Sequence, residues 1–260
     1  MVPKYSVVTI NIGSYELVRE IEVKSENAEY ILITDDPNLK SETWTIKLVE
    51  NKYPKDNFYT VFNIRYNIFD YINTDIAFVI DGSIKIVNNL DIFIEKMEEN
   101  NADCCLFLHN FNWTLKQEYI AWTEWRNYPD EQVEKIKKII GDYWFYDHKG
   151  LFVRTAMIQK NTNDINKWNQ LSFEYCKLLK YNKDSEVDRV DQTISSYILQ
   201  KYFYDTIRPI YVSIELLNTG KYLQWFGHGN NRRLYSIPNN NIRSIFKPYF
   251  FDKDVATIEL

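Results

Sequence analysis

Cysteine is scarce in this chain of 260 residues, which has only Cys104, Cys105 and Cys176. Two of these residues are adjacent, a spacing that suits neither a disulfide framework nor a metal motif. We therefore expect buried, reduced thiols, the usual state of cysteine in a cytosolic protein.

Long apolar runs are also missing from the sequence. No stretch approaches the roughly 18 consecutive apolar residues that a membrane span needs. The first five residues lead directly into an apolar strand, without the charged region and cleavage site of a signal peptide. We expect a cytoplasmic protein whose membrane contact, if it has any, is peripheral and at the inner face.

Positive charge does not dominate the sequence, because 31 Lys and Arg residues face 36 Asp and Glu residues, a formal net charge of -5. A general nucleic-acid binder would show a basic footprint, so we expect no nucleic-acid partner. The turn at Gly13 lacks the three-glycine fingerprint of dinucleotide binders, which disfavours a dehydrogenase. No glycine-rich and basic loop follows Ile12, which disfavours a nucleotidyltransferase.

Aromatic residues are plentiful, at 16% of the chain with 20 Tyr and 7 Trp. Their faces suit the stacking of sugars and bases, although core packing is the commoner fate of any one ring. The length fits one large domain, or one domain with an appendage.

The segment around Asp81 is the centre of the predicted fold. Residues 77–80 are apolar on both faces of a strand, as in the middle of a sheet that is covered on two sides. Asp81 then stands at the carboxyl end of a buried strand, the rim where open α/β sheets bind ligands. A carboxylate there can hold a divalent cation that carries a diphosphate. The alternative is a plain Asp-Gly turn.

Apolar periodicity along the rest of the chain predicts an α/β protein with a mixed, mainly parallel sheet flanked by helices. Strands are expected at 5–12, 29–34, 43–48, 77–81, 104–108, 150–155 and 207–216. Helices are expected at 15–23, 58–71, 91–99, 131–140, 165–179 and 193–202, with Ser14 capping the first of them.

Several polar residues stand where these elements begin or end. Asp35 follows a strand and suits either a base or ribose contact or a turn. Asp191 and Gln192 lie in the first turn of a helix, where the helix dipole favours a carboxylate. In the tail, His228, Arg232 and Arg233 suit phosphate binding. The basic and aromatic residues that follow suit either an anionic membrane surface or packing on the domain.

Taken in order, these features resemble a glycosyltransferase of the GT-A fold. The similarity is to the glycogenin and lipopolysaccharide-galactosyltransferase type and to the related domains of plants and bacterial polysaccharide loci. It covers about residues 5 to 205 and depends on the order of short pieces. These are Thr9-Ile10-Asn11-Ile12-Gly13, Thr34-Asp35-Asp36, Asn63-Ile64-Arg65-Tyr66, Phe78-Val79-Ile80-Asp81-Gly82-Ser83, His109 with Glu118, Gly150 to Arg154, Trp168 and Asp191-Gln192.

The resemblance implies a GT-A-like catalytic domain over 1–215 and an extension over 216–260 that completes the site or packs on the domain. It implies transfer of a hexose from a nucleotide diphosphate donor, with UDP the expected nucleotide. The acceptor would be a glycan or a lipid-linked sugar in surface polysaccharide, capsule or glycoconjugate synthesis. A noncatalytic sugar- or nucleotide-binding module of the same fold is the alternative.

The resemblance also implies roles for individual residues. The donor-binding set would be Thr9, Asn11, Gly13, Asp35, Arg65, Asp81, Ser83 and Arg154. Arg65 would bind the diphosphate or orient Asp81. Mn²⁺ or Mg²⁺ would be held by Asp81, Ser83 and His228, although Ser83 stands where the family has a second metal-binding carboxylate.

The expected catalytic residues are Asp191, Gln192 and Glu118. Asp191 and Gln192 correspond to an acceptor-side pair near the reacting sugar carbon. In an inverting reaction, Asp191 or Glu118 would be the general base that takes the proton of the acceptor hydroxyl. In a retaining reaction, the donor phosphate would take it.

Overall fold

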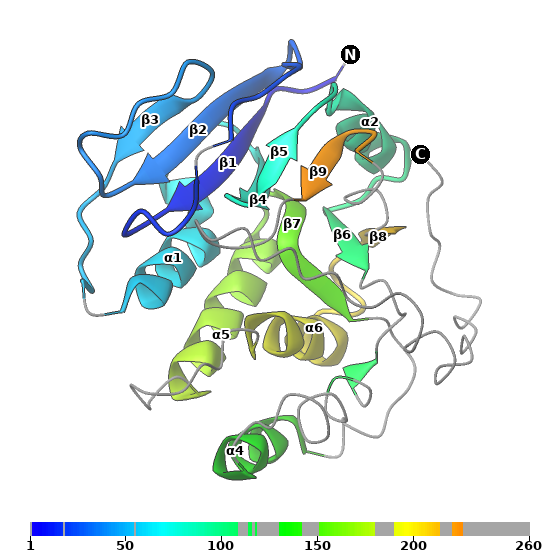
Figure 1. Ribbon diagram of the computed structural model, residues 1–260. Coiled ribbons are helices and arrows are strands. Elements are labelled where there is room, and N and C mark those ends of the chain that lie inside the picture. Colours follow the sequence, from blue (N-terminus) through cyan, green and yellow to red (C-terminus); the bar gives the residue numbers. More distant parts are fainter. Residues whose placement is uncertain are drawn as a thin grey trace, which may run out of the picture.

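A computed structural model describes residues 2–17, 19–54, 56–108, 114–115, 118, 130–141, 151–179, 190–213 and 220–225. Its main feature is a seven-stranded sheet in the order β3-β2-β1-β4-β7-β6-β8 (Figure 1). The strands are β1 (Tyr5–Asn11), β2 (Ala28–Thr34), β3 (Thr45–Leu48), β4 (Ile76–Asp81), β6 (Cys104–Leu108), β7 (Phe152–Lys160) and β8 (Pro209–Ser213).

The sheet is mixed but mainly parallel. Strands β3, β2, β1 and β4 run parallel to one another, and β6 is parallel to β8. Only β7 is antiparallel to the strands on either side of it, β4 and β6. The start of β7 therefore lies at the same edge as the carboxyl ends of the other strands. This confirms the predicted class, an α/β protein with a mixed, mainly parallel sheet flanked by helices.

Helices cover both faces of the sheet (Figure 1). They are α1 (Asn57–Tyr66), η1 (Ile68–Asp70), α2 (Asp91–Glu99), α4 (Asp130–Ile140), α5 (Asn163–Leu179) and α6 (Val190–Tyr202). Helix α1 packs on the face of Val79, and α5 and α6 pack on that of Met157. Because Val79 and Met157 are paired across β4 and β7, these helices share one face. Helix α2 covers the other face, where Phe78 packs on Phe93.

Strand β4 occupies the middle of the sheet, as the sequence predicts. Every residue of β4 except Asp81 is buried, because β1 and β7 flank the strand and helices cover both of its faces. Asp81 follows this apolar run as the last residue of β4, and it is the one residue of the strand that is partly exposed. The three cysteines are buried and free, as expected.

A second, two-stranded sheet pairs β5 (Ile84–Ile86) with β9 (Leu223–Trp225) in antiparallel register. Strand β9 lies in the predicted C-terminal extension, and Leu223 is buried with Ile84 and Ile86 in the core on the α2 face. Most of the extension, residues 226–260, lies outside the described residues. The division at residue 215 stays a prediction.

Several element boundaries differ from the prediction. The predicted helix 58–71 ends at Tyr66, where Asn67 caps it, and a 3-10 turn follows. The strand predicted over 150–155 begins at Phe152 and extends to Lys160. The helix predicted over 193–202 begins earlier, at Val190. Among the described helices, none combines the length and apolar character needed to cross a bilayer.

The helix predicted over residues 15–23 is wrong, because the described residues there have an irregular backbone with bends. Ser14 has a positive φ of 52° and does not cap a helix. The Asn11 side chain binds both the N–H and the carbonyl of Glu16 at 3.0 Å. Trp44 donates to the carbonyl of Arg19 at 2.8 Å. Since distant side chains bind these backbone groups, the segment forms an irregular loop and not a helix.

Glu20 connects this irregular loop (residues 15–23) to the loop before β3. Its carboxylate accepts hydrogen bonds from the Ser41 hydroxyl at 2.8 Å, from the Thr43 N–H at 3.0 Å and from the Thr43 hydroxyl. Burial raises the pKa of Glu20, but these hydrogen bonds outweigh it and the net shift is downward. A carboxyl whose pKa is lowered in the folded state adds stability above its unfolded pKa of about 4.3, and this is lost as the pH falls through the folded pKa.

Replacing Glu20 with Gln is therefore expected to lower the free energy of unfolding at pH 7 by about 1 kcal/mol, since neutral hydrogen bonds replace charged ones. The difference between the two proteins should shrink as the pH falls below about 4. Urea unfolding at several pH values measures it. The control is Glu22→Gln, which removes a half-exposed ion pair with Lys85. A difference that stays constant with pH would contradict the prediction.

Candidate functional site

The centre of the candidate site is an ion pair between Asp81 and Arg65. Asp81 ends β4, and Arg65 lies in the last turn of α1, which packs on the face of the sheet to which Asp81 points. The two side chains are only 16% and 9% exposed, respectively. A buried pair of this kind holds both groups in fixed positions, because either charge alone would be costly to bury.

Asp191, in the first turn of α6, joins the pair from the other side. Its carboxylate lies 3.7 Å from Nη1 of Arg65 and 4.0 Å from Nε of Arg154. Burial raises the pKa of the Asp191 carboxyl, and the charges of Arg65 and Arg154 oppose this shift without cancelling it. Two aspartates and two arginines therefore form a largely buried cluster with balanced charge, which we call the Arg–Asp cluster (Arg65, Asp81, Arg154 and Asp191).

Arg154 reaches the cluster because of the direction of β7. The sequence predicts that Arg154 stands near the end of a strand, but it is the third residue of β7. Since β7 is antiparallel to β4, its beginning lies at the edge where β4 ends. The predicted position near the strand's end is therefore wrong, and Arg154 reaches the edge where β4 ends because β7 runs in the opposite sense.

Two residues that the sequence reasoning missed hold Arg154 in place. Its Nη1 donates to the Ser195 hydroxyl at 3.0 Å, and its guanidinium carbon lies 4.3 Å from the centre of the Tyr66 ring. Ser195 is four residues after Asp191 on α6 and so shares its helix face. That spacing, and the adjacency of Tyr66 to Arg65, are the signals that point to these residues.

Gln192 and Glu118 also meet in the structure, and their predicted catalytic roles stay predictions. The Gln192 amide donates to the Glu118 carboxylate at 3.2 Å, and both side chains are buried. Gln192 follows Asp191 directly, so Glu118 is connected to the cluster through this amide. The three predicted catalytic residues are neighbours.

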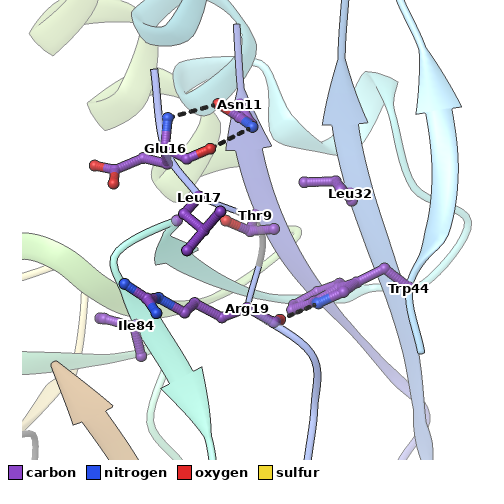
Figure 2. A pocket seen from close by; sticks show the side chains of 9 residues that line it. Thr9, Asn11, Glu16, Leu17, Arg19, Leu32, Trp44 and Ile84 are labelled. Atoms are coloured by element: carbon purple, nitrogen blue, oxygen red, sulfur yellow. Dashed lines mark hydrogen bonds between the residues drawn. The ribbon is translucent and has the colours of Figure 1, made fainter. Parts of the chain in front are cut away.

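Thr9 and Asn11 lie at the same edge of the sheet but on its other face. Figure 2 shows them beside Trp44 and Leu32 in a small pocket, into which Arg19 also extends. The Thr9 hydroxyl is buried and has no hydrogen-bond partner in the described part of the chain. Gly82, directly after Asp81, lines the same pocket and connects it to the cluster.

Gly13 and Asp35 form a separate polar network. The Asp35 carboxylate accepts hydrogen bonds from the Gly13 N–H at 2.7 Å and from the Asn51 amide at 3.1 Å. Gly13 has a φ of 67°, and a Cβ at this position would lie 2.0 Å from the Asn57 amide nitrogen. Only glycine fits there. Asp35 thus joins two loops in this structure, and its predicted contact with a base stays a prediction.

The residues predicted to hold a metal are only partly described. Asp81 is already bound to Arg65, and Ser83 supplies one neutral hydroxyl, which is buried and has no partner among the described residues. Within the described ranges, no three His, Cys, Asp or Glu residues gather as a metal site would require. A divalent cation needs several oxygen ligands, so these described donors alone do not fit one. His228, Arg232 and Arg233 lie outside the described residues.

The sequence matches no protein-family model and no curated protein in the comparisons made. We therefore infer its function from the chemistry of the site.

Proposed function

We propose that this protein is a GT-A-fold glycosyltransferase that transfers a hexose from a nucleotide diphosphate donor, with a UDP-sugar as the first candidate. The observation that carries the proposal is the buried Arg–Asp cluster at the carboxyl end of the central strand, the edge where α/β proteins bind their ligands. The proposed acceptor is a glycan or a lipid-linked sugar in surface polysaccharide or glycoconjugate synthesis.

The proposed reaction breaks the bond between the sugar's anomeric carbon and the diphosphate oxygen, and the electron pair leaves with the diphosphate. A new bond forms from the anomeric carbon to the acceptor oxygen. The departing diphosphate gains negative charge, which fixed cationic groups stabilise. Arg65 supports this role because it is buried, fixed by Asp81 and close to Asp191.

Asp191 is the proposed proton acceptor of an inverting reaction, in which its carboxylate takes the proton of the acceptor hydroxyl. Neither arginine approaches it closer than 3.7 Å, so it keeps lone pairs available for a substrate proton. Glu118, connected through Gln192, is the other candidate. In a retaining reaction the donor phosphate takes the proton, and the anomeric configuration of the product distinguishes the two.

A noncatalytic binding module is the second candidate function. The observations that favour it are the ion pair already made by Asp81 and the neutral Ser83 beside it, since a glycosyltransferase of this type uses a second carboxylate there. A module would bind nucleotide sugars without turning them over. Release of nucleoside diphosphate from the donor separates the two functions.

The cofactor, partners and location remain part of the proposal. Mn²⁺ or Mg²⁺, if bound, would neutralise the diphosphate, and its site would need ligands in addition to Asp81 and Ser83. We propose a cytoplasmic enzyme whose partners are its sugar donor and acceptor, and not nucleic acid. The C-terminal tail would make peripheral contact with the inner face of the membrane.

The test is a panel of nucleotide sugars, each measured with and without Mn²⁺. Thermal shift identifies the donor, because a ligand that binds the native state raises its apparent stability. Donors that bind are then assayed for release of nucleoside diphosphate. Release supports the enzyme, whereas binding without release supports the module. If no nucleotide sugar binds, both functions are wrong.

Replacing Asp191 with Asn is expected to reduce transfer by about 10²–10⁴-fold while donor binding persists, because the change removes a general base. The loss of one negative charge beside Arg65 and Arg154 should leave the affinity for an anionic donor unchanged or higher. Titration calorimetry with the nucleoside diphosphate and a transfer assay measure the two effects. A parallel loss of affinity and transfer would contradict the assignment of Asp191.

A further inference from the structure

Arg154 is a buried cation whose hydrogen-bonding capacity is only partly used. The residue is 2% exposed, yet its Nε and Nη2 have no hydrogen-bond partner in the described part of the chain. Unpartnered buried donors are rare and costly in native structures, and a guanidinium binds oxygen pairs best through this Nε–Nη2 edge. The unused edge faces Asp191, whose carboxylate lies 4.0 Å from Nε.

The rest of the guanidinium is held firmly. Nη1 donates to Ser195, and the Tyr66 ring lies 4.3 Å from the guanidinium carbon in a cation–π contact. The hydroxyl oxygens of Tyr66 and Ser195 are 3.1 Å apart, and the Tyr66 hydroxyl is 3.5 Å from Sγ of Cys176. Burial keeps the pKa of Tyr66 well above its usual value, so the phenol retains its proton.

These contacts form a chain of hydrogen bonds that begins at Arg154 and ends at Cys176. Arg154 donates to the Ser195 oxygen, the Ser195 hydroxyl can donate to Tyr66, and the Tyr66 hydroxyl can donate to Cys176. The backbone at Ser195 is itself anchored, because Trp168 donates to its carbonyl at 3.0 Å. All of these side chains are buried, so water does not compete for the bonds.

We propose that Ser195 and Tyr66 are positioning residues that hold Arg154 beside Asp191 and keep its Nε and Nη2 donors from pairing with the Asp191 carboxylate. Without Ser195, the guanidinium is free to rotate onto the Asp191 carboxylate, because a direct hydrogen-bonded ion pair would satisfy the unpartnered donors. That closure would occupy the unpaired Nε and Nη2 donors and also the lone pairs of Asp191 that the proposed reaction uses. The catalytic part of this inference rests on the proposed function, whereas the placement of Arg154 does not.

The test compares Ser195→Ala with two controls in the full-length protein. Ser195→Thr keeps the hydroxyl. Ser196→Ala removes a buried hydroxyl from the next residue of α6, which donates to the Gln192 carbonyl at 2.7 Å and accepts from the Phe152 N–H at 3.4 Å. In the described part of the chain this hydroxyl makes no hydrogen bond to an arginine. The two alanine variants lose similar packing, so a difference between them reports on Arg154.

The first measurement is the motion of the Arg154 Nε–H group by NMR relaxation, assigned with Arg154→Lys. In the wild type we expect an order parameter near that of rigid backbone, about 0.85, and in Ser195→Ala either a value below about 0.6 or a shifted resonance from closure onto Asp191. Ser195→Thr and Ser196→Ala should match the wild type. A mobile Arg154 in the wild type, or an unchanged signal in Ser195→Ala, would overturn the inference.

The second measurement is turnover with the donor found in the panel. Ser195→Ala should lower kcat by about 10- to 100-fold, as expected for a displaced group at the reacting centre, with little change in KM. Ser195→Thr should restore kcat. If the wild type releases no nucleoside diphosphate, the proposed function fails, and the NMR result still decides the placement of Arg154. If Ser195→Ala does not fold, Tyr66→Phe serves instead. In that variant we expect the order parameter of Arg154 to fall to a value between those of the wild type and of a mobile side chain. An unchanged order parameter would overturn the inference.

Discussion

Replacing Arg65 with Met is expected to lower the free energy of unfolding by about 3–5 kcal/mol, the cost of removing one partner of a buried ion pair. Arg65 is paired with Asp81 and lies 3.7 Å from Asp191. Its loss leaves the largely buried Asp81 without a described cation within 4.0 Å, and leaves the buried Asp191 with only Arg154 among the described cations at that distance. The thermal midpoint should fall by at least about 6 °C, given about 2–4 °C per kcal/mol for a domain of this size. Urea and thermal unfolding measure both quantities.

The matched control is Arg208→Met. Arg208 pairs with Asp103 at the start of β6, the opposite edge of the sheet, and its side chain is 58% exposed. An exposed pair of this kind contributes about 0–1 kcal/mol. Adding Asp81→Asn to Arg65→Met should recover part of the lost stability, because it removes one of the unpaired charges. Equal losses for the Arg65 and Arg208 variants would show that the cluster is not a buried charge network.

The elements that the sequence predicts best are those whose apolar pattern is set by burial. Strand β4 is apolar on both faces and lies in the middle of the sheet, and α2 begins and ends at the predicted residues. In both, local pattern and tertiary environment agree. The position of Asp81 at the carboxyl edge follows directly from the burial of the strand before it.

The predictions that failed depended on contacts between distant residues. Residues 15–23 have a helical pattern, but the side chains of Asn11 and Trp44 take the backbone groups that a helix would need. The direction of β7 has no local signature, since it is decided by which strands it meets. Ser195 and Tyr66 were missed for a related reason, because a polar residue on a buried helix face shows its role only when its partner on another element is known.

Replacing Asp81 with Asn is expected to reduce glycosyl transfer by at least about 10²–10³-fold while the fold persists. Asn keeps the size of the side chain and one oxygen acceptor for Arg65, so the geometry at the end of β4 changes little. The charge is lost, however, and Arg65 is then held mainly by Asp191 at 3.7 Å. A fixed electrostatic group at the reacting centre is typically worth this factor in kcat. Release of nucleoside diphosphate from the donor measures it.

The control for this variant is Asp103→Asn, which neutralises an aspartate that also pairs with an arginine, but at the opposite edge of the sheet. Its transfer rate should equal that of the wild type. Circular dichroism should show the same fold for both variants, because each retains a side chain of the same shape. Asp81→Asn should have the lower thermal midpoint, because it neutralises one partner of a largely buried ion pair. If Asp81→Asn transfers sugar at the wild-type rate, the carboxylate at the end of the central strand has no part in the chemistry, and the Arg–Asp cluster is a structural feature of the core.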